Sequence, residues 1–269
     1  MLATRVLTAG IALVVFLAAL FLLPQTLWAC FLLFLLAAGG WEWATLAGWS
    51  SAMRYTYVVL LALCAVALVY IVPHLTRASA FVDLTLFVAS AIFWIAVAPF
   101  WLARRWRLRH PLILGVVGWI ALVPMWLAMV RLQATPWALI LYMAVVWIAD
   151  TAAYAAGKTW GRHKLAPLIS PGKTWEGAFG ALGGVALYFG AVSLLAPPHA
   201  AYVNGLLGLA LALVMVVLSI EGDLFESWMK RQAGVKDSGR LLPGHGGVLD
   251  RIDGLTAALP AAALAYYLH

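Results

Sequence analysis

Two pairs of carboxylates near the end of the chain have a spacing that suits metal binding. Asp223 and Glu226 lie three residues apart, and so do Asp250 and Asp253. On a helix, this spacing places both side chains of a pair on one face. Mg²⁺ in proteins is held by one or two carboxylates and keeps its other positions for water and phosphate. The two pairs therefore predict a site for a hard divalent cation beside a phosphate-bearing substrate.

The segment 221–253, which contains these pairs, is far richer in charge than the whole chain, of which 10% is charged. Its lysines and arginines suit a highly anionic substrate, and Gly246 and Gly247 would let backbone N–H groups approach phosphates. His245 could be a metal ligand, an acid–base group or a loop donor. Zinc is not expected, because the segment has no cysteine and no second histidine. A solvated, salt-bridged linker is the alternative, but it would not need Gly-His-Gly-Gly.

An acidic residue inside an apolar run marks a second candidate. Asp150, Tyr154 and Gly157 are spaced to share one helix face. A carboxylate at the membrane centre costs roughly 2.5–3.5 kcal/mol. We therefore expect Asp150 to face a polar cavity or a cation, with a structural ion pair to Lys158 as the alternative.

A third candidate is the segment 170–177, which opens the next apolar run. Its Gly-Lys-Thr is typical of the end of a P-loop, but the required earlier glycine is replaced by Pro167, and we predict no strand before it. A helix start with free N–H groups beside Lys173 could cradle a phosphate. A capped, charged helix start explains the segment equally well. The candidate substrate-binding residues here are Ser170, Lys173, Thr174 and Glu176.

The composition decides the class of protein that carries these residues. Of the 269 residues, 65% are hydrophobic, and the mean hydropathy is +0.99. A soluble domain is about half apolar and about a quarter charged, so a soluble enzyme and a disordered or collagen-like chain are excluded. The net charge of +7 fits basic cytoplasmic loops facing anionic lipids rather than nucleic acid binding. The chain is predicted to be a polytopic membrane protein.

Continuous apolar runs of about 20 residues each predict a transmembrane helix. They fall at 7–23, 27–48, 56–72, 81–102, 111–130, 136–156, 176–196, 203–220 and 254–268. We expect an all-α bundle of about nine spans, since the runs lack the alternation of a barrel strand. Residues 1–135 would form the N-terminal helices, and residues 136–269 the catalytic region with cytoplasmic loops 157–175 and 221–253.

The charges predict an orientation for these spans. With the arginines of 104–109 in the cytoplasm, all but two of the 17 basic residues, Arg77 and Arg131, lie on that side, and the N-terminus is cytoplasmic. All but two of the ten acidic residues, Glu42 and Asp83, lie at or after Asp150. The chemistry is therefore expected in the second half, facing the cytoplasm. Glu42 is expected to pair with a basic residue or to reach the pocket.

The segment from Ser227 to Asp253 resembles the signature of the phosphatidate cytidylyltransferases, or CDP-diacylglycerol synthases. It reads Ser-x-Met-Lys-Arg-x₄-Lys-Asp-x-Gly-x₂-Leu-Pro-x-His-Gly-Gly-Val-x-Asp-Arg-Ile-Asp, with every fixed position filled. The segments 150–164 and 170–177 are similar to other typical stretches of that family. The hydrophobic first half carries no diagnostic motif.

This resemblance implies a reaction and a set of roles. The reaction is CTP + phosphatidate → CDP-diacylglycerol + pyrophosphate, dependent on Mg²⁺, at the cytoplasmic face of a bacterial inner membrane, in a multi-helix protein that forms a homodimer. By motif position, Asp223 and Asp250 become the metal-holding carboxylates, supported by Asp237 and Asp253. The predicted phosphate contacts are Lys230, Arg231, Lys236 and Arg251.

Three other functions compete with this interpretation. A CTP-using polyprenol or dolichol kinase would transfer a γ-phosphoryl group to an alcohol and release CDP. A secondary transporter would place its ionisable residues near the bilayer centre, often in two matching halves, whereas here the charges cluster at one face of the second half. A structural membrane scaffold would leave the charged segment unexplained.

Overall fold

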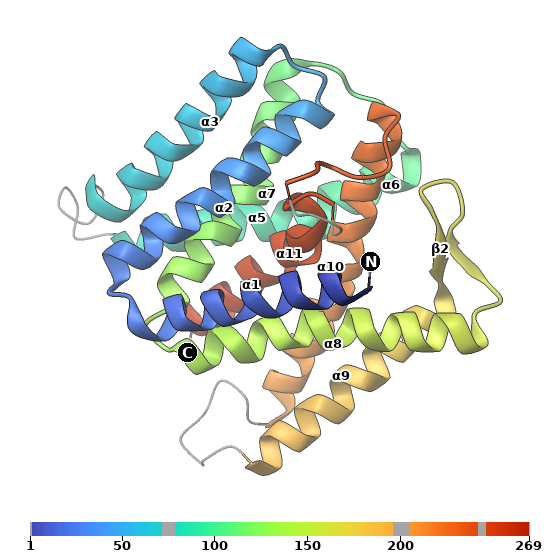
Figure 1. The fold of residues 1–269 in the computed structure, drawn as a ribbon. Helices are drawn as coiled ribbons and strands as arrows, with labels where there is room; N and C mark the ends of the chain where they lie inside the picture. Colours follow the sequence, from blue (N-terminus) through green and yellow to red (C-terminus); the bar gives the residue numbers. More distant parts are fainter. Residues whose placement is uncertain (1, 72–78, 196–204, 242–245, 269) are drawn as a thin grey trace. The chain divides into compact units, whose positions relative to one another are not determined.

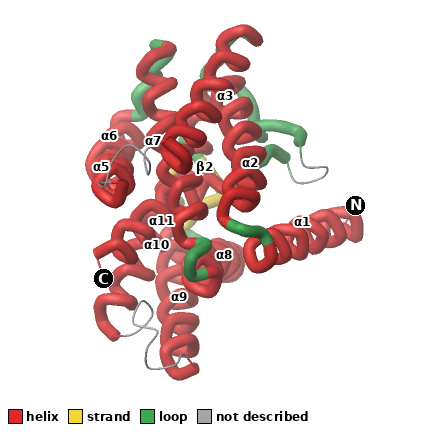
Figure 2. The backbone as a smooth tube through the Cα atoms, turned by 90° about the vertical axis from the view of Figure 1, so that its left-hand side faces the viewer, coloured by secondary structure: helices red, strands yellow, loops and turns green. Residues whose placement is uncertain are grey.

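The computed structural model describes residues 2–71, 79–195, 205–241 and 246–268, and these residues are almost entirely helical (Figure 1). The helices are α1 (Leu2–Leu22), α2 (Gln25–Leu46), α3 (Ser51–Val66), α5 (Ser79–Ile92), α6 (Ala98–Arg104), α7 (Pro111–Leu132), α8 (Pro136–Trp160), α9 (Trp175–Leu195), α10 (Gly205–Ala233) and α11 (Leu249–Leu268). Within the described ranges, strands occur only as β1 (Lys164–Ala166) and β2 (Ser170–Thr174), the short ribbon visible in Figure 2. The predicted all-α fold is confirmed.

Seven helical stretches in the described chain are long and apolar enough to cross a membrane. They are Gln25–Leu46, Ser51–Tyr70, Ser79–Arg104, Pro111–Leu132, Pro136–Trp160, Trp175–Leu195 and Gly205–Ala233. Two of them include short π-helical segments, η1 (Ala67–Ile71) after α3 and η2 (Phe93–Val97) after α5. The other two predicted spans coincide with α1, whose described apolar part is the shorter Gly10–Leu22, and with α11.

The two predicted loops are more regular than expected. In the segment 157–175, α8 continues to Trp160, and an antiparallel β1–β2 hairpin follows. The expectation that no strand would accompany the Gly-Lys-Thr sequence was therefore wrong. In the segment 221–253, α10 continues to Ala233 and α11 begins at Leu249. Most of the predicted site residues thus stand on helices or on the hairpin.

The chain forms two compact units. The first unit takes residues 1–86, 107–136 and 229–252, and the second takes residues 87–106, 137–228 and 253–269. Helices α10 and α11 each contribute to both units. Asp223 and Asp253 therefore belong to the second unit, whereas Lys230 and Asp250 belong to the first.

Two tryptophan side chains of α2 form hydrogen bonds to α7 in the first unit. Trp28 of α2 donates its indole N–H to the Met129 carbonyl of α7 at 3.0 Å, and Trp43 donates to the Leu114 carbonyl at 2.9 Å. Gly118 of α7 leaves the space that Trp43 fills, because a Cβ there would overlap the indole. Each ring thus buries apolar area while its single polar group is satisfied.

Arg131, one of the two basic residues that depart from the predicted charge pattern, lies in a buried ion pair of the first unit. Arg131 donates from Nε to Asp83 Oδ2 at 2.7 Å, and Asp83 is 3% exposed. The ion pair as a whole is close to neutral, which makes the burial of both side chains less costly. The other exception, Arg77, lies outside the described residues.

In the second unit, α8 and α9 meet through small residues. A Cβ on Gly180 would overlap the Ala156 methyl group, and a Cβ on Gly184 would lie 2.6 Å from that of Ala152. Glycine at these positions lets two membrane helices approach closely. Close helix packing therefore explains the Gly-x-x-x-Gly pattern formed by Gly180 and Gly184.

Gly180→Val is therefore expected to lower the thermal stability of the protein. The added branched side chain has no room against Ala156, and overpacking typically costs about 1–3 kcal/mol. Gly183→Val is the matched control on the same helix, because a Cβ at Gly183 meets nothing within 4 Å. A melting experiment in detergent should show a lower transition for the first variant alone. Equal melting temperatures would contradict the packing.

Candidate active site

The second unit holds a polar cavity of about 520 Å³. Six predicted site residues on α8, β2 and α10 line it: Asp150, Tyr154, Ser170, Lys173, Thr174 and Asp223. A volume of this order suits a small-molecule ligand. The cavity therefore unites the three segments that the sequence singled out separately.

Close packing of three helices brings the carboxylates of this unit together. A Cβ on Gly222 of α10 would overlap the Asp253 carbonyl oxygen of α11, and a Cβ on Gly254 of α11 would lie 3.2 Å from Ser219 and from Val146 of α8. The glycines thus set the distance between α8, α10 and α11. As a result, Asp150, Asp223 and Asp253 interact electrostatically with one another.

Lys173 faces these three carboxylates. Lys173 Nζ lies 2.7 Å from Asp223 Oδ2 and donates to the Ile220 carbonyl at 3.3 Å. It also attracts Asp150 and Asp253. One ammonium cannot neutralise three ionised carboxylates, so a bound cation would be needed to stabilise all three in the ionised form.

The hairpin fixes the position of this lysine. Lys164 of β1 pairs with Thr174 of β2, and the Trp175 N–H donates to the His163 carbonyl at 2.9 Å. The Thr174 hydroxyl then accepts the Gly177 N–H at 3.1 Å, which caps the start of α9. The capped helix start considered for this segment is confirmed, and Lys173 stands immediately before the cap.

The carboxylate of Glu176 makes a structural contact beside the hairpin. It accepts the His163 Nδ1 contact at 2.6 Å and the His163 backbone N–H at 3.2 Å. Glu176 therefore holds the residue that precedes the hairpin, and it is not among the residues that line the cavity. Its predicted part in substrate binding stays a prediction.

An aromatic cluster holds α10 next to the cavity. The Phe225 ring contacts Phe93, Trp94 and Trp101 edge-on, at centroid distances of 5.6, 5.5 and 5.4 Å. One turn along α10, Trp228 donates its indole N–H to the Trp106 carbonyl at 3.0 Å. Because Phe225 is only two residues from Asp223, these contacts restrain the helix that carries the carboxylate.

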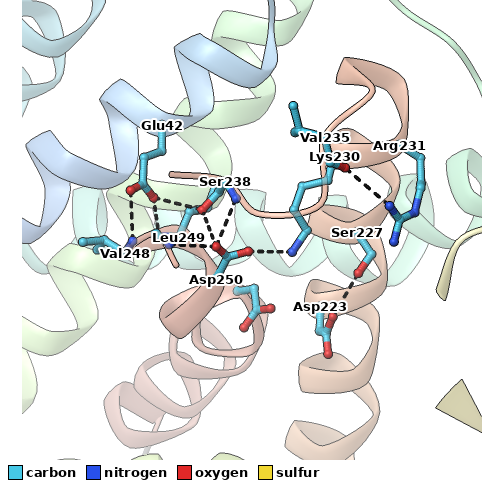
Figure 3. Close-up of polar contacts among 12 residues, drawn as sticks. Glu42, Asp223, Ser227, Lys230, Arg231, Val235, Ser238, Val248, Leu249 and Asp250 are labelled. Atoms are coloured by element: carbon cyan, nitrogen blue, oxygen red, sulfur yellow. Dashed lines mark hydrogen bonds and ion pairs between the residues drawn. The ribbon is translucent and has the colours of Figure 1, made fainter. Parts of the chain in front are cut away.

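The first unit holds a second polar cluster, built around Asp250 (Figure 3). Lys230 Nζ lies 2.6 Å from Asp250 Oδ1, and both side chains are largely buried. Asp250 Oδ2 accepts the Ser238 N–H at 3.0 Å, the Ser238 hydroxyl at 2.9 Å and the Gly247 N–H at 2.9 Å. Burial alone would raise the pKa of Asp250, but the hydrogen bonds from Lys230, Gly247 and Ser238 lower it to about 2.

This cluster includes two residues that sequence reasoning did not assign. Glu42 of α2 bonds to Ser238 and to the start of α11. The signature leaves position 238 open, and Glu42 lies in the half of the chain without a diagnostic motif. Of the two expectations for Glu42, the ion pair with a basic residue is not found among the described residues, where backbone N–H groups and a hydroxyl hold the carboxylate. The sequence signal that could have identified Glu42 was its carboxylate inside an otherwise apolar span.

The remaining predicted residues lie either in the first unit or outside the described residues. Arg231, Lys236, Asp237 and Arg251 are exposed in the first unit, where Gly246 and Gly247 also lie. The Gly247 N–H, predicted to meet a phosphate, donates to Asp250. His245 lies outside the described residues.

The structure gives a mixed picture of the predicted metal site. Within the described parts of the chain, no three His, Cys, Asp or Glu side chains are gathered tightly enough to hold a metal ion. Mg²⁺ needs only one or two carboxylates, so the oxygen ligands Asp223 and Asp253 still suit it. The idea that Asp223 shares an ion with Asp250 joins residues of two units and stays a prediction.

Comparison with known proteins gives consistent matches. A family model described as the cytidylyltransferase family matches residues 3–269. The phosphatidate cytidylyltransferase of Pseudomonas aeruginosa is 42% identical over 271 residues, which cover 98% of this chain and 96% of that protein. The protein of the same name from Brucella suis is 54% identical over 129 residues, covering 48% and 45% of the two chains. That from Haemophilus influenzae is 45% identical over 136 residues, covering 48% and 46%.

Proposed function

The chain belongs to the cytidylyltransferase family, and we propose that it is a membrane enzyme of phospholipid synthesis. It condenses CTP with phosphatidate to give CDP-diacylglycerol and pyrophosphate. The observation that carries the proposal is the cavity in which Lys173, Ser170 and Thr174 face Asp150 and Asp223. Such a site offers cationic and hydroxyl groups to phosphates, and carboxylates to a cation that accompanies them.

The proposed reaction does not need a strong general base. A phosphate monoester is mostly a dianion at neutral pH, because its second pKa is near 6. An oxygen of the phosphatidate phosphate can therefore attack the α-phosphorus of CTP directly. The new P–O bond forms as the bond to the β-phosphate oxygen breaks, and pyrophosphate leaves with the electron pair. The main obstacle is the repulsion between two polyanions, so catalysis rests on positioning and charge neutralisation.

Residues of the second unit supply this positioning and charge neutralisation. Lys173 is held by the hairpin and by Asp223 at 2.7 Å, so its ammonium is oriented toward substrate phosphate oxygens before they bind. Ser170 adds a hydroxyl donor at the cavity wall. Tyr154 is 69% exposed, and the Lys158 ammonium lies over its ring at 5.6 Å. This places a second cation at the same cavity.

We propose Mg²⁺ as the cofactor. Asp223 and Asp253 would hold it, with Asp150 nearby, because the three carboxylates repel one another and a bound cation would relieve that repulsion. When bound, the ion supplies positive charge at the phosphates. The predicted role of Asp250 as a second metal-holding carboxylate rests on its position in the family signature.

Chelation of divalent cations is therefore expected to abolish turnover. Without the cation, the substrate phosphates would meet the carboxylate cluster with its repulsion uncompensated. The measurement is CDP-lipid formation by the purified protein before and after EDTA treatment, followed by addition of Mg²⁺, which should restore the rate. Calorimetric titration of Mg²⁺ into the metal-free protein should show binding that Asp223→Asn weakens. Full activity in excess EDTA would refute the cofactor.

We further propose that the cavity faces the cytoplasm at the inner membrane of a bacterium, and that the protein is a homodimer. CTP is water-soluble and arrives from the cytoplasm, whereas phosphatidate stays in its leaflet, so a pocket at the helix ends serves both. The strong bias of basic residues to one side supports this orientation. Labelling of single cysteines in loop 104–109 in inverted and right-side-out vesicles tests it.

The function itself is tested by a reconstituted assay. Purified protein in detergent with phosphatidate micelles, labelled CTP and Mg²⁺ should form a labelled CDP-lipid and an equal amount of pyrophosphate. Diacylglycerol in place of phosphatidate is the matched control, since it lacks the attacking phosphate. Product formation from diacylglycerol, or none from phosphatidate, would overturn the proposal.

A further inference from the structure

One carboxylate of the motif-free first half is bound to the signature segment. We propose that Glu42 is a positioning residue, which holds the start of α11 and, through Ser238, the carboxylate of Asp250 for the transfer reaction. The inference rests on the proposed function for its kinetic consequence. Its structural part concerns the first unit alone.

The contacts of Glu42 are those of a helix cap supplied by another helix. Glu42 Oε1 accepts the Val248 N–H at 3.0 Å, and Oε2 accepts the Leu249 N–H at 2.7 Å. These N–H groups lie at the beginning of α11, where a helix has donors without internal acceptors. A negative charge is stabilised at this end by the helix dipole. Because Glu42 is 5% exposed, water cannot replace it.

The glycines of the signature enclose this carboxylate. A Cβ on Gly239 would overlap Glu42 Oε1, and a Cβ on Gly247 would lie 2.5 Å from Oε2. Glycine at these two positions therefore has a structural explanation, which for Gly247 stands beside the predicted approach of phosphate. Gly239 and Gly247 thus lie close to a protein carboxylate that the signature does not contain.

Ser238 links Glu42 to Asp250 (Figure 3). Its hydroxyl lies 3.1 Å from Glu42 Oε2 and 2.9 Å from Asp250 Oδ2, and its N–H donates to the same Asp250 oxygen at 3.0 Å. The hydroxyl has one proton for two carboxylates, so a change at either carboxylate alters the hydrogen bond to the other. Glu42 thus restrains Asp250 both through the first turn of α11 and through Ser238.

The helix that carries Glu42 is itself fixed. The neighbouring Trp43 is 2% exposed, and its indole N–H is bonded to the Leu114 carbonyl of α7 at 2.9 Å. Glu42 therefore extends from a rigid helix, as a positioning group requires. Small misplacements of catalytic groups are costly, and about 1 Å corresponds to about 100-fold in rate.

The test compares Glu42→Gln with Asp83→Asn in the full-length protein. Glutamine keeps the size of the side chain but presents an NH₂ group to backbone donors. Hydrogen exchange should show faster exchange of the peptide 246–252, and kcat should fall about tenfold or more with the KM for CTP changed less than threefold. Asp83→Asn breaks another buried carboxylate contact of the same unit. It should lower stability while leaving exchange in 246–252 and kcat per folded molecule unchanged.

A double variant separates positioning from general stability. Ser238→Ala keeps the backbone N–H donor to Asp250 and removes the shared hydroxyl. If Glu42 acts through Ser238, the effects of Glu42→Gln and Ser238→Ala on kcat should be less than additive. Normal exchange and normal kcat in Glu42→Gln would overturn the proposal, as would additive effects. If the wild type makes no CDP-lipid, the proposed function fails, and the exchange of 246–252 still decides the structural part.

Discussion

Asp223→Asn should lower kcat by at least about 100-fold, the order of effect seen when one electrostatic catalytic group is removed. Asp223 is the centre of the carboxylate cluster. It pairs with Lys173 at 2.7 Å, accepts the Ser227 hydroxyl at 3.2 Å, and interacts with Asp150 and Asp253. The amide removes the negative charge that orients Lys173 and that would bind the cation. CDP-lipid formation at saturating substrates is the measurement.

The fold should tolerate this change. Losing the ion pair with Lys173 is unfavourable, but removing one of three mutually repelling carboxylates is favourable, so the melting temperature should change little. Glu221→Gln is the matched control on the same helix, because residues two apart point to different sides of α10. Its activity should stay within about threefold of the wild type. Near-normal activity of Asp223→Asn would remove Asp223 from the active site.

Asp250→Asn should also lower kcat by at least about 100-fold, and it should reduce stability as well. Asp250 accepts hydrogen bonds from Lys230, Ser238 and Gly247. An amide NH₂ in place of one oxygen faces these donors instead of accepting from them. Breaking a buried ion pair by removing one partner costs about 3–5 kcal/mol.

The pH dependence of stability should follow from the same contacts. The pKa of Asp250 is lowered from 3.8 to about 2, so the folded state favours the ionised form. The stability that this carboxylate contributes is present at neutral pH and is lost as the pH falls from about 4 toward 2. Asp250→Asn should abolish this part of the acid sensitivity, which thermal melts between about pH 5 and pH 2 can measure.

A double variant distinguishes the two roles of Asp250. Lys230→Met removes the charge that Asp250→Asn leaves buried, so the double variant should regain stability over Asp250→Asn alone. Activity should stay lost, because neither the carboxylate nor the ammonium is restored. Recovery of activity together with stability would show that Asp250 serves the fold only.

Much of the architecture could be predicted because each membrane helix requires a long run of apolar residues, which is visible in the sequence. Every predicted span overlaps a described helix, and seven of the nine overlap helical stretches long and apolar enough to cross a membrane, since a chain in lipid must satisfy its backbone within each helix. Asp150, Ser170 and Lys173 could be picked out because polar groups in apolar surroundings are costly. Their meeting with Asp223 at one cavity could not, because it depends on how closely Gly222 and Gly254 let the helices approach.

Other features carry weak sequence signals for physical reasons. The β1–β2 hairpin is only a few residues long and lacks an alternating pattern, so nothing distinguishes it from a loop. The contacts of Glu42 with Val248 and Leu249 span more than 200 residues and involve backbone donors. Backbone groups are the same at every position, and the sequence therefore could not identify this partner.

The fate of the two ends of the CTP triphosphate tests the central claim most directly. Purified protein should be given phosphatidate, Mg²⁺ and CTP labelled on either the α- or the γ-phosphorus, with Asp223→Asn run in parallel. The account predicts that the α-label enters the lipid and the γ-label leaves as pyrophosphate, at a rate that Asp223→Asn nearly abolishes. Recovery of the γ-label in a lipid with release of CDP would identify a kinase and contradict the account.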